Sequence, residues 1–158
     1  MRLLLQRVKR ASVRVDGQIV GQIEQGIVAL VGIAATDTMR EIEWMSNKLI
    51  KLRIFADAEG KMNCSLVDVQ GGILLVSQFT LYADAEKGLR PSYTQAAPPQ
   101  LAAPVYEQML RHLRATSGVR VEAGIFGAMM DVELINDGPV TIWLEREAEQ
   151  RSTPSDTL

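Results

Sequence analysis

The sequence predicts a single α+β domain with a barrel-like, mainly antiparallel β-sheet and two main α-helices. Alternating apolar and polar residues run through most of the chain, as they do in strands that cover a core with one face. Two segments of helical periodicity are inserted among these strands, and short turns join consecutive strands, which favours antiparallel pairing. With 158 residues, 47% of them hydrophobic, the chain can form one core of ordinary size.

The first part of the chain is predicted to contain four strand segments and one helix. Asp16-Gly17 is a strong signal for a two-residue hairpin turn. Thr38 and Glu41 have the spacing of a capping box, and apolar residues follow at helical intervals, so residues 38–52 are predicted to form an amphipathic helix. The predicted strand segments cover residues 2–8, 12–15, 18–23 and 27–33.

The stretch 72–82 organises the rest of the chain. Its apolar run, residues 73–76, follows a glycine turn and predicts a strand that is buried on both faces. Ser77, Gln78 and Thr80 come directly after this run, so the end of a rigid strand presents two hydroxyls and a carboxamide. Such groups either bond water or a neighbouring turn, which is the commoner case, or bind a ligand.

The second half of the chain continues with a long loop, a helix and further strands. Residues 83–99 lack periodicity and carry Lys87 and Arg90 near the end of the central strand, so this loop either binds phosphate or is a plain surface loop. The helix covers residues 101–117 and ends at Gly118. A hairpin of residues 119–125 and 132–134 follows, and then a final strand at residues 141–144.

Asn136-Asp137-Gly138-Pro139 is most simply a turn between two strands. Roughly 5–6% of X-Pro bonds in folded proteins are cis, however, and Gly is the least hindered residue before Pro. A cis bond here would orient the neighbouring carbonyls as acceptors for an ammonium group. The domain is predicted to span residues 1–145, and residues 146–158 are predicted to be a disordered tail.

Composition excludes several classes of protein. A net charge of −2 and a pI of about 5.5 do not fit a protein that holds nucleic acid mainly by neutralising phosphates. Residues 1–14 carry five basic residues and no acid, which fits either a phosphate-binding edge or a guard against aggregation. A single Cys64 and a single His112 predict no disulfide, zinc site or cofactor. No apolar run suits a signal or a membrane span, so a soluble, cytosolic protein is expected.

The candidate chemistry is limited by the lack of a base. No Ser-His-Asp arrangement and no phosphate-binding glycine loop is present in the sequence. If Ser77 or Thr80 takes part in a reaction, the bond that breaks must already be activated, as an ester is. Backbone N–H groups around Phe79 and Thr80 are candidates for stabilising the developing oxyanion.

The sequence contains two short motifs, Ser77-Gln78-Phe79-Thr80-Leu81 and, later, Asn136-Asp137-Gly138-Pro139-Val140-Thr141. Together they resemble the signatures of the D-aminoacyl-tRNA deacylases, also called D-tyrosyl-tRNA deacylases. Shorter matches at residues 6–8, 87–92 and 124–128 extend the resemblance over about residues 1–145. Either motif alone is weak, but the pair with this spacing is specific.

The resemblance implies a homodimer that releases a D-amino acid, or glycine, from tRNA by hydrolysing the ester to the terminal adenosine. It implies that the Gly138-Pro139 bond is cis and reaches the partner subunit's pocket, where its carbonyls hold the substrate's amino group. An L side chain would collide with this backbone, whereas a D side chain points outward. Glycine has no side chain and is therefore also accepted. Chiral proofreading of this kind needs no cofactor and no membrane.

The resemblance also assigns roles to single residues. Ser77, Gln78, Phe79 and Thr80 line the reaction site, with Asn136, Gly138 and Pro139 on the substrate-binding loop. Either Thr80 is the nucleophile, or the tRNA's own 2′-hydroxyl assists while backbone groups at Gln78 and Phe79 hold the oxyanion; the missing base favours the second view. Phe126 and Met130 wall the pocket, and Arg7 supports the Gly-Pro loop.

Two other hypotheses remain open from the sequence. One is a non-catalytic, nucleic-acid-binding dimer with the same fold, which fits the basic N-terminal segment but leaves the motif pair without a purpose. The other is a hydrolase of small D-amino acid esters or peptides, which would act without tRNA.

Overall fold

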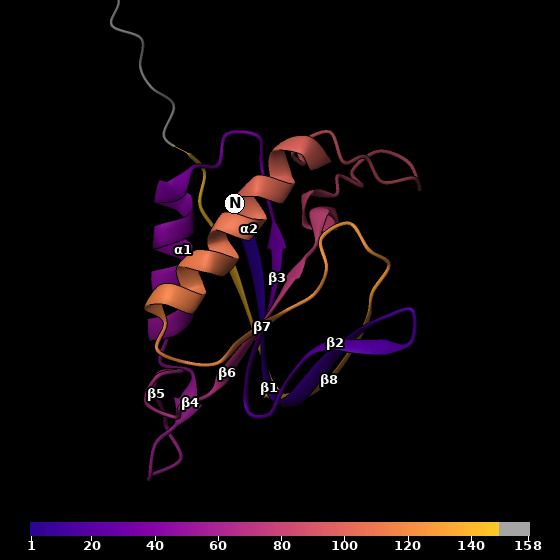
Figure 1. Cartoon of the computed structure of the whole chain (residues 1–158). Coiled ribbons are helices and arrows are strands. Elements are labelled where there is room, and N and C mark those ends of the chain that lie inside the picture. The colour runs from indigo at the N-terminus through magenta and orange to yellow at the C-terminus, as the bar shows by residue number, and fades with distance from the viewer. Residues whose placement is uncertain (149–158) are drawn as a thin grey trace, which may run out of the picture.

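The computed structural model describes residues 1–148, which form a curled β-sheet with two helices packed on one face (Figure 1). This arrangement confirms the predicted α+β class, the barrel-like sheet and the two main helices. The 3₁₀ helix η1 follows β6 directly. The elements in chain order are β1 (Arg2–Val15), β2 (Gln18–Ile23), β3 (Gly26–Gly32), α1 (Met39–Lys51), β4 (Phe55–Ala56), β5 (Met62–Cys64), β6 (Gly72–Ser77), η1 (Phe79–Tyr82), α2 (Pro99–Thr116), β7 (Val121–Ala123) and β8 (Asp131–Glu145).

Strand β1 is the centre of the sheet. It pairs antiparallel with β2, β3 and β8. The pairs β3–β6 and β6–β7 are parallel, so the sheet is mixed and less antiparallel than the sequence suggested. The cause is the two helices, because each lies between strands that become neighbours, and a connection that crosses one face of a sheet produces parallel strands.

Strand β6 is buried on both faces, as its apolar run predicted. Ile73 and Leu75 belong to the core between the sheet and the helices, whereas Leu74 and Val76 belong to a second core inside the curl of the sheet. All four side chains are almost completely inaccessible to solvent. This double burial fixes the position of Ser77, the last residue of the strand.

Several predicted elements differ from the structure. The predicted hairpin of residues 119–125 and 132–134 is wrong, because β7 pairs with β6 and β8 pairs with β1. The turn expected at Asn136-Pro139 lies inside the single long strand β8, where the pairing with β1 is irregular. The predicted strand segments 2–8 and 12–15 both belong to the single strand β1. The pairing of β1 with β8 is irregular between Gln6 and Arg10, which lies near the break between the two predicted segments.

Helix α1 begins with the predicted capping box. The Thr38 N–H donates to Glu41 Oε2 at 2.8 Å, and the Thr38 hydroxyl donates to the same oxygen at 2.7 Å. Burial alone would raise the pKa of the Glu41 carboxyl, but these hydrogen bonds outweigh it and lower that pKa below its ordinary value of 4.5. A carboxylate is therefore held, ionised, at the positive end of a helix.

Thr38→Ala is expected to lower the free energy of unfolding by about 1–2 kcal/mol, because the cap is lost and a buried carboxylate loses a donor. A lowered folded-state pKa stabilises the protein above pH 4.5, and this stabilisation is lost as the pH falls through the folded-state value. The variant should therefore lose less stability on acidification than the wild type. Urea unfolding at pH 7 and near pH 4 measures both effects. If the free energy of unfolding fell equally in the variant and the wild type between these pH values, the prediction about acidification would be contradicted.

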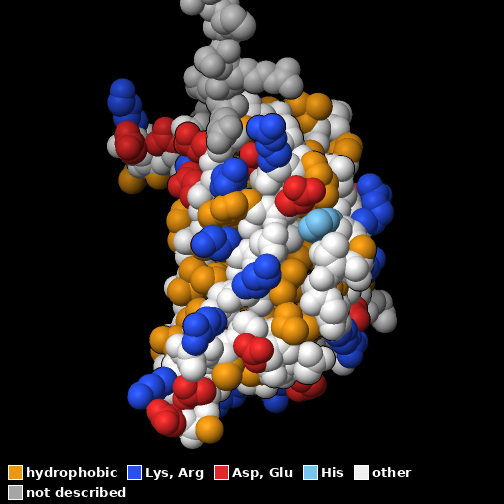
Figure 2. All heavy atoms as spheres, turned by 90° about the vertical axis from the view of Figure 1, so that its left-hand side faces the viewer, with side chains coloured by type: hydrophobic (Ala, Val, Ile, Leu, Met, Phe, Trp, Pro, Cys, Tyr) orange, Lys and Arg blue, Asp and Glu red, His pale blue; other side chains and the backbone are white. Residues whose placement is uncertain are grey.

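Figure 2 shows the side of the molecule on which α1 lies, where several basic side chains follow one another down the face with a few acidic and apolar side chains between them. Beyond β8, the Arg146 guanidinium lies 5.2 Å from the centre of the Trp44 ring. The predicted disordered tail falls mostly on residues 149–158, outside the described residues, and stays a prediction. In residues 1–148 no helix is long and apolar enough to cross a bilayer.

Candidate active site

A cavity of about 770 Å³ opens at the carboxyl end of β6. This volume lies in the range of small-molecule sites. Its walls come from β3, β6 and η1, from the segment before and at the start of α2, from residues 126–130, and from Val132 of β8. Six of the residues that the sequence nominated line it: Ser77, Gln78, Phe79, Thr80, Phe126 and Met130.

The cavity is apolar except at the end of β6, and it contains no strong base. Within residues 1–148, its lining includes no Asp, Glu, His, Lys or Arg, and Tyr93 is its one titratable residue. His112 lies on α2 and is not among the lining residues. A hydroxyl in this cavity has no partner that could accept its proton, as the sequence suggested.

The backbone of η1, whose first two residues line the cavity, has free donors. The Gln78 N–H is already used, because it donates to the Val31 carbonyl at 2.7 Å. The Gln78 side-chain amide donates to the Thr80 hydroxyl. In the described part of the chain, the N–H groups of Phe79 and Thr80 donate to no acceptor, as is usual for the first turn of a helix. The available donor pair is therefore Phe79 and Thr80 rather than Gln78 and Phe79.

Tyr106 lies behind the cavity wall and packs against Phe126, which lines the cavity. Its buried hydroxyl donates to the Leu75 carbonyl at 2.9 Å, and its ring lies 5.7 Å from that of Phe126, centre to centre. Burial raises the pKa of the Tyr106 hydroxyl, which keeps it a donor. Gly124 leaves room for Met130, because a Cβ at Gly124 would lie 2.5 Å from the Met130 sulfur.

The remaining nominated residues form a separate cluster around the irregular part of β8. Gly138 has φ +121°, a conformation that favours glycine, and the Gly138-Pro139 peptide bond is cis. Arg7 holds this loop through Nε, which donates to the Asp137 carbonyl at 3.1 Å and lies 3.2 Å from its carboxylate. The Asn136 amide donates to the carbonyls of Arg7 and Val140, at 2.9 and 3.2 Å. Gly138 and Pro139 themselves are exposed.

The two clusters do not meet within one chain. None of Arg7, Asn136, Gly138 and Pro139 lines the cavity. Arg7 is in register with Ile27, and Ile27 with Ile73, four residues before Ser77. This offset is about 13 Å along the strands, and β1 and β3 lie between β8 and β6.

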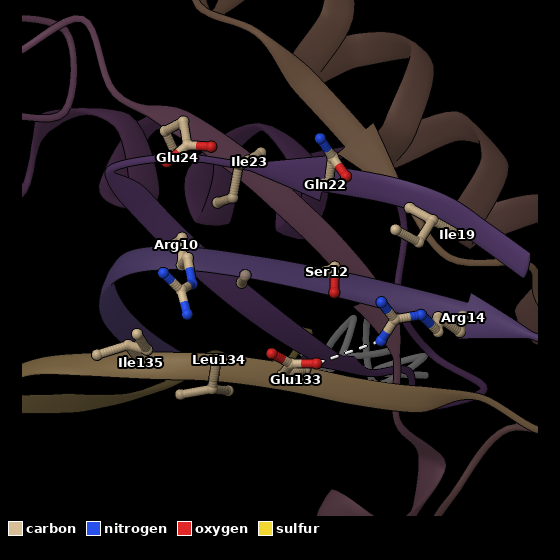
Figure 3. Close-up of a pocket in the computed structure, with 11 residues that line it drawn as sticks. Arg10, Ser12, Arg14, Ile19, Gln22, Ile23, Glu24, Glu133, Leu134 and Ile135 are labelled. Carbon is tan, nitrogen blue, oxygen red and sulfur yellow. Dashed lines mark hydrogen bonds and ion pairs between the residues drawn. The ribbon is translucent and has the colours of Figure 1, made fainter. Parts of the chain in front are cut away.

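The basic N-terminal strand is largely neutralised by β8. Three of its five cations are paired with β8 acids, and a small hollow of about 170 Å³ beside Arg10 and Arg14 is also lined by Glu24 and Glu133 (Figure 3). The phosphate-binding interpretation of this strand is therefore weakened. The three ion pairs are Arg2–Glu145 at 2.6 Å, Arg7–Asp137 at 3.2 Å and Arg14–Glu133 at 3.2 Å.

Tyr93 was missed from the sequence. It lines the cavity, and its ring meets the Phe79 ring edge to face, with 5.1 Å between the centres. An aromatic residue in a long loop that follows the central strand was the available signal.

Comparison with known proteins agrees with this architecture. The family model described as D-Tyr-tRNA(Tyr) deacylase matches residues 4–145. A protein of Acaryochloris marina named D-aminoacyl-tRNA deacylase is 55% identical over 94% of this chain and 98% of its own length. A protein of the same name from Thermomicrobium roseum is 57% identical over 92% of this chain and 94% of its own.

A solved structure titled c-Myc DNA Unwinding Element Binding Protein has a TM-score of 0.89 and 44% identity, covering 94% of this chain and all of that one. The family model and the named relatives show the class of protein: it is an enzyme, a hydrolase. The chain belongs to the D-Tyr-tRNA(Tyr) deacylase family. The family identified from the two sequence motifs is confirmed.

Proposed function

We propose that the protein hydrolyses the ester between a D-amino acid, or glycine, and the terminal adenosine of tRNA, and that it acts as a homodimer in the cytoplasm. Family membership supports the reaction, and the cavity supports the substrate. Its apolar walls suit the terminal adenosine, and the hydroxyls and amides at the end of β6 suit the polar ester group. The observation that best supports this reaction is the pair of free N–H groups at Phe79 and Thr80, two residues that line a cavity without a base.

The homodimer explains why the second motif lies away from the cavity. Within residues 1–148, β8 pairs with β1 alone, so it is an edge strand of fifteen residues whose loop at Gly138 is exposed. A second copy that packs on this edge could place its Gly138 and Pro139 carbonyls in the cavity. In that position they accept hydrogen bonds from the substrate's ammonium group and block an L side chain, whereas a D side chain or glycine fits.

The reaction needs only positioning and oxyanion stabilisation. Water attacks the ester carbonyl carbon, the carbonyl oxygen becomes an oxyanion, and the Phe79 and Thr80 N–H groups stabilise it. The bond to the ribose oxygen then breaks, and the ribose leaves as a hydroxyl after it receives a proton. The vicinal 2′-hydroxyl of the tRNA relays to the ribose oxygen the proton that the attacking water gives up, which is consistent with a cavity that offers no side-chain base.

The direct test is release of free tyrosine from D-Tyr-tRNA and from L-Tyr-tRNA. We expect fast release from the D ester and no release above the spontaneous rate from the L ester. Equal cleavage of both esters would contradict chiral exclusion, and no cleavage of either would contradict the proposed reaction.

Thr80→Ala separates the two catalytic mechanisms. We expect kcat to fall by less than about tenfold, because the 2′-hydroxyl supplies the assistance and Ala keeps the backbone N–H. A fall of 10³-fold or more with unchanged substrate binding would instead make Thr80 the nucleophile. Single-turnover kinetics on D-Tyr-tRNA, with the binding constant measured separately, decide between these results.

A nucleic-acid-binding function is the second candidate, because a 44% identical solved structure carries a title that names DNA binding. The ion pairs between β1 and β8 argue against it, since they leave few cations free for phosphates. Binding of duplex DNA as tightly as tRNA in 150 mM salt would favour this candidate. Cleavage of a simple D-tyrosine ester as fast as D-Tyr-tRNA would favour the small-ester hydrolase.

A further inference from the structure

A short arm of the chain, residues 83–93, joins η1 to the wall of the cavity, which its last residue Tyr93 lines. Mutual hydrogen bonds between the backbones of Asp84 and Ser92, both 2.8 Å, close its base. Its tip turns at Gly88, which has φ +75°, and Leu89 beside it is fully exposed. In Figure 1 these residues project beyond η1 and the start of α2. The arm therefore forms a closed loop whose tip packs against nothing in residues 1–148.

Tyr93 ties the arm to the reaction site. It follows the closed base of the arm and contacts Phe79, whose N–H group is one of the two free donors. Both rings line the cavity. The arm thus begins directly after η1, which lines the cavity, and ends at Tyr93 in the cavity wall, so both ends of the arm lie at the cavity.

The tip carries two cations with no partner in the fold. Lys87 and Arg90 are exposed, and neither forms an ion pair with any residue between 1 and 148, unlike Arg2, Arg7 and Arg14. Asp84 stays at the base, where its carboxylate accepts the Glu86 N–H at 3.0 Å. The exposed carboxylate of Glu86 forms no ion pair with either cation in residues 1–148. Two unpaired positive charges on an arm that ends at the cavity suit an anionic ligand that extends out of that cavity.

We propose that Lys87 and Arg90 bind phosphates of the single-stranded tRNA end that leads to the terminal adenosine. This inference rests on the proposed function, because the adenosine must lie in the cavity for its preceding phosphates to meet the arm. The hollow beside Arg10 offers a poorer phosphate site, since Glu24 and Glu133 share its lining (Figure 3). If two cations bind phosphates of a single strand, the affinity for tRNA should fall with rising salt by an amount set by these two contacts.

The experiment compares wild type with Lys87→Ala/Arg90→Ala, using D-Tyr-tRNA at 50–300 mM salt. The plot of log(kcat/KM) against log salt should become shallower by about 1.4, or about 0.7 for each phosphate that the variant no longer neutralises. At 50 mM salt, kcat/KM should fall about tenfold through KM, with kcat at saturation unchanged. The control is Arg111→Ala, which removes an exposed charge from α2 and should leave the slope unchanged.

A second variant controls for damage to the fold by the substitutions. A second readout, the binding of tRNA, does not depend on the proposed reaction. Lys87→Arg/Arg90→Lys keeps both charges and should retain the wild-type slope. Binding of uncharged tRNA, followed by fluorescence anisotropy, should weaken in the alanine variant even if D-Tyr-tRNA proved not to be a substrate. An unchanged slope together with unchanged tRNA binding would overturn the role of the arm, whatever the fate of the proposed reaction.

Discussion

Mixing two inactive variants is expected to restore about a quarter of the wild-type deacylase activity. Gly138→Ala should be inactive because φ is +121° at this residue and the new Cβ would lie 2.9 Å from an Arg7 guanidinium nitrogen. Phe79→Pro should be inactive because it removes a free donor at the cavity. If each site combines one subunit's cavity with the partner's loop, a mixed dimer has one site with both defects and one with neither.

Random pairing makes about half of the dimers mixed, and half of their sites intact, which gives the expected quarter. The two variants carry different affinity tags, are unfolded together and refolded, and D-Tyr-tRNA is added to the refolded mixture. Mixed dimers purified through both tags should reach about half of the wild-type activity, since one of their two sites is intact. Each variant refolded alone serves as the control and should stay below about 1% of wild-type activity. Mixed dimers that remain inactive would show that each subunit contains a complete site, and the cross-subunit proposal would fail.

Local signals in the sequence predicted local structure well. The Thr38 capping box and the Asp16-Gly17 hairpin turn depend on residues within four positions of each other, and both are present. The doubly buried strand was predictable for the same reason, since four consecutive apolar residues cannot face water on either side. The Ser77-to-Thr80 part of the cavity could be predicted because it follows that strand directly.

Features that depend on distant segments could not be predicted in the same way. Residues 121–123 alternate like a hairpin strand, but α2 carries them to the edge of β6, where they pair in parallel. Asn136-Pro139 has the composition of a turn, yet long pairing with β1 on both sides keeps it within β8. Tyr93 carries no periodic signal, and only its contact with Phe79 places it at the site.

Replacing Phe79 with Pro is expected to lower kcat by about 10²–10³-fold, the usual effect of removing one oxyanion donor. Pro is tolerated at the first position of a helix, where its fixed φ fits and its missing N–H breaks no bond; the Phe79 N–H donates to no acceptor in residues 1–148. The fold should therefore survive, and thermal unfolding together with binding of uncharged tRNA checks this.

Phe79→Leu separates the backbone effect from the loss of the ring. Leu removes the aromatic contact with Tyr93 but keeps the N–H group, so it should raise KM and leave kcat within about tenfold of wild type. If Pro and Leu lowered kcat equally, the ring rather than the N–H would matter, and oxyanion binding at η1 would be contradicted. A large loss in kcat for Pro alone would assign the charge that develops on the ester oxygen to the backbone of this 3₁₀ turn.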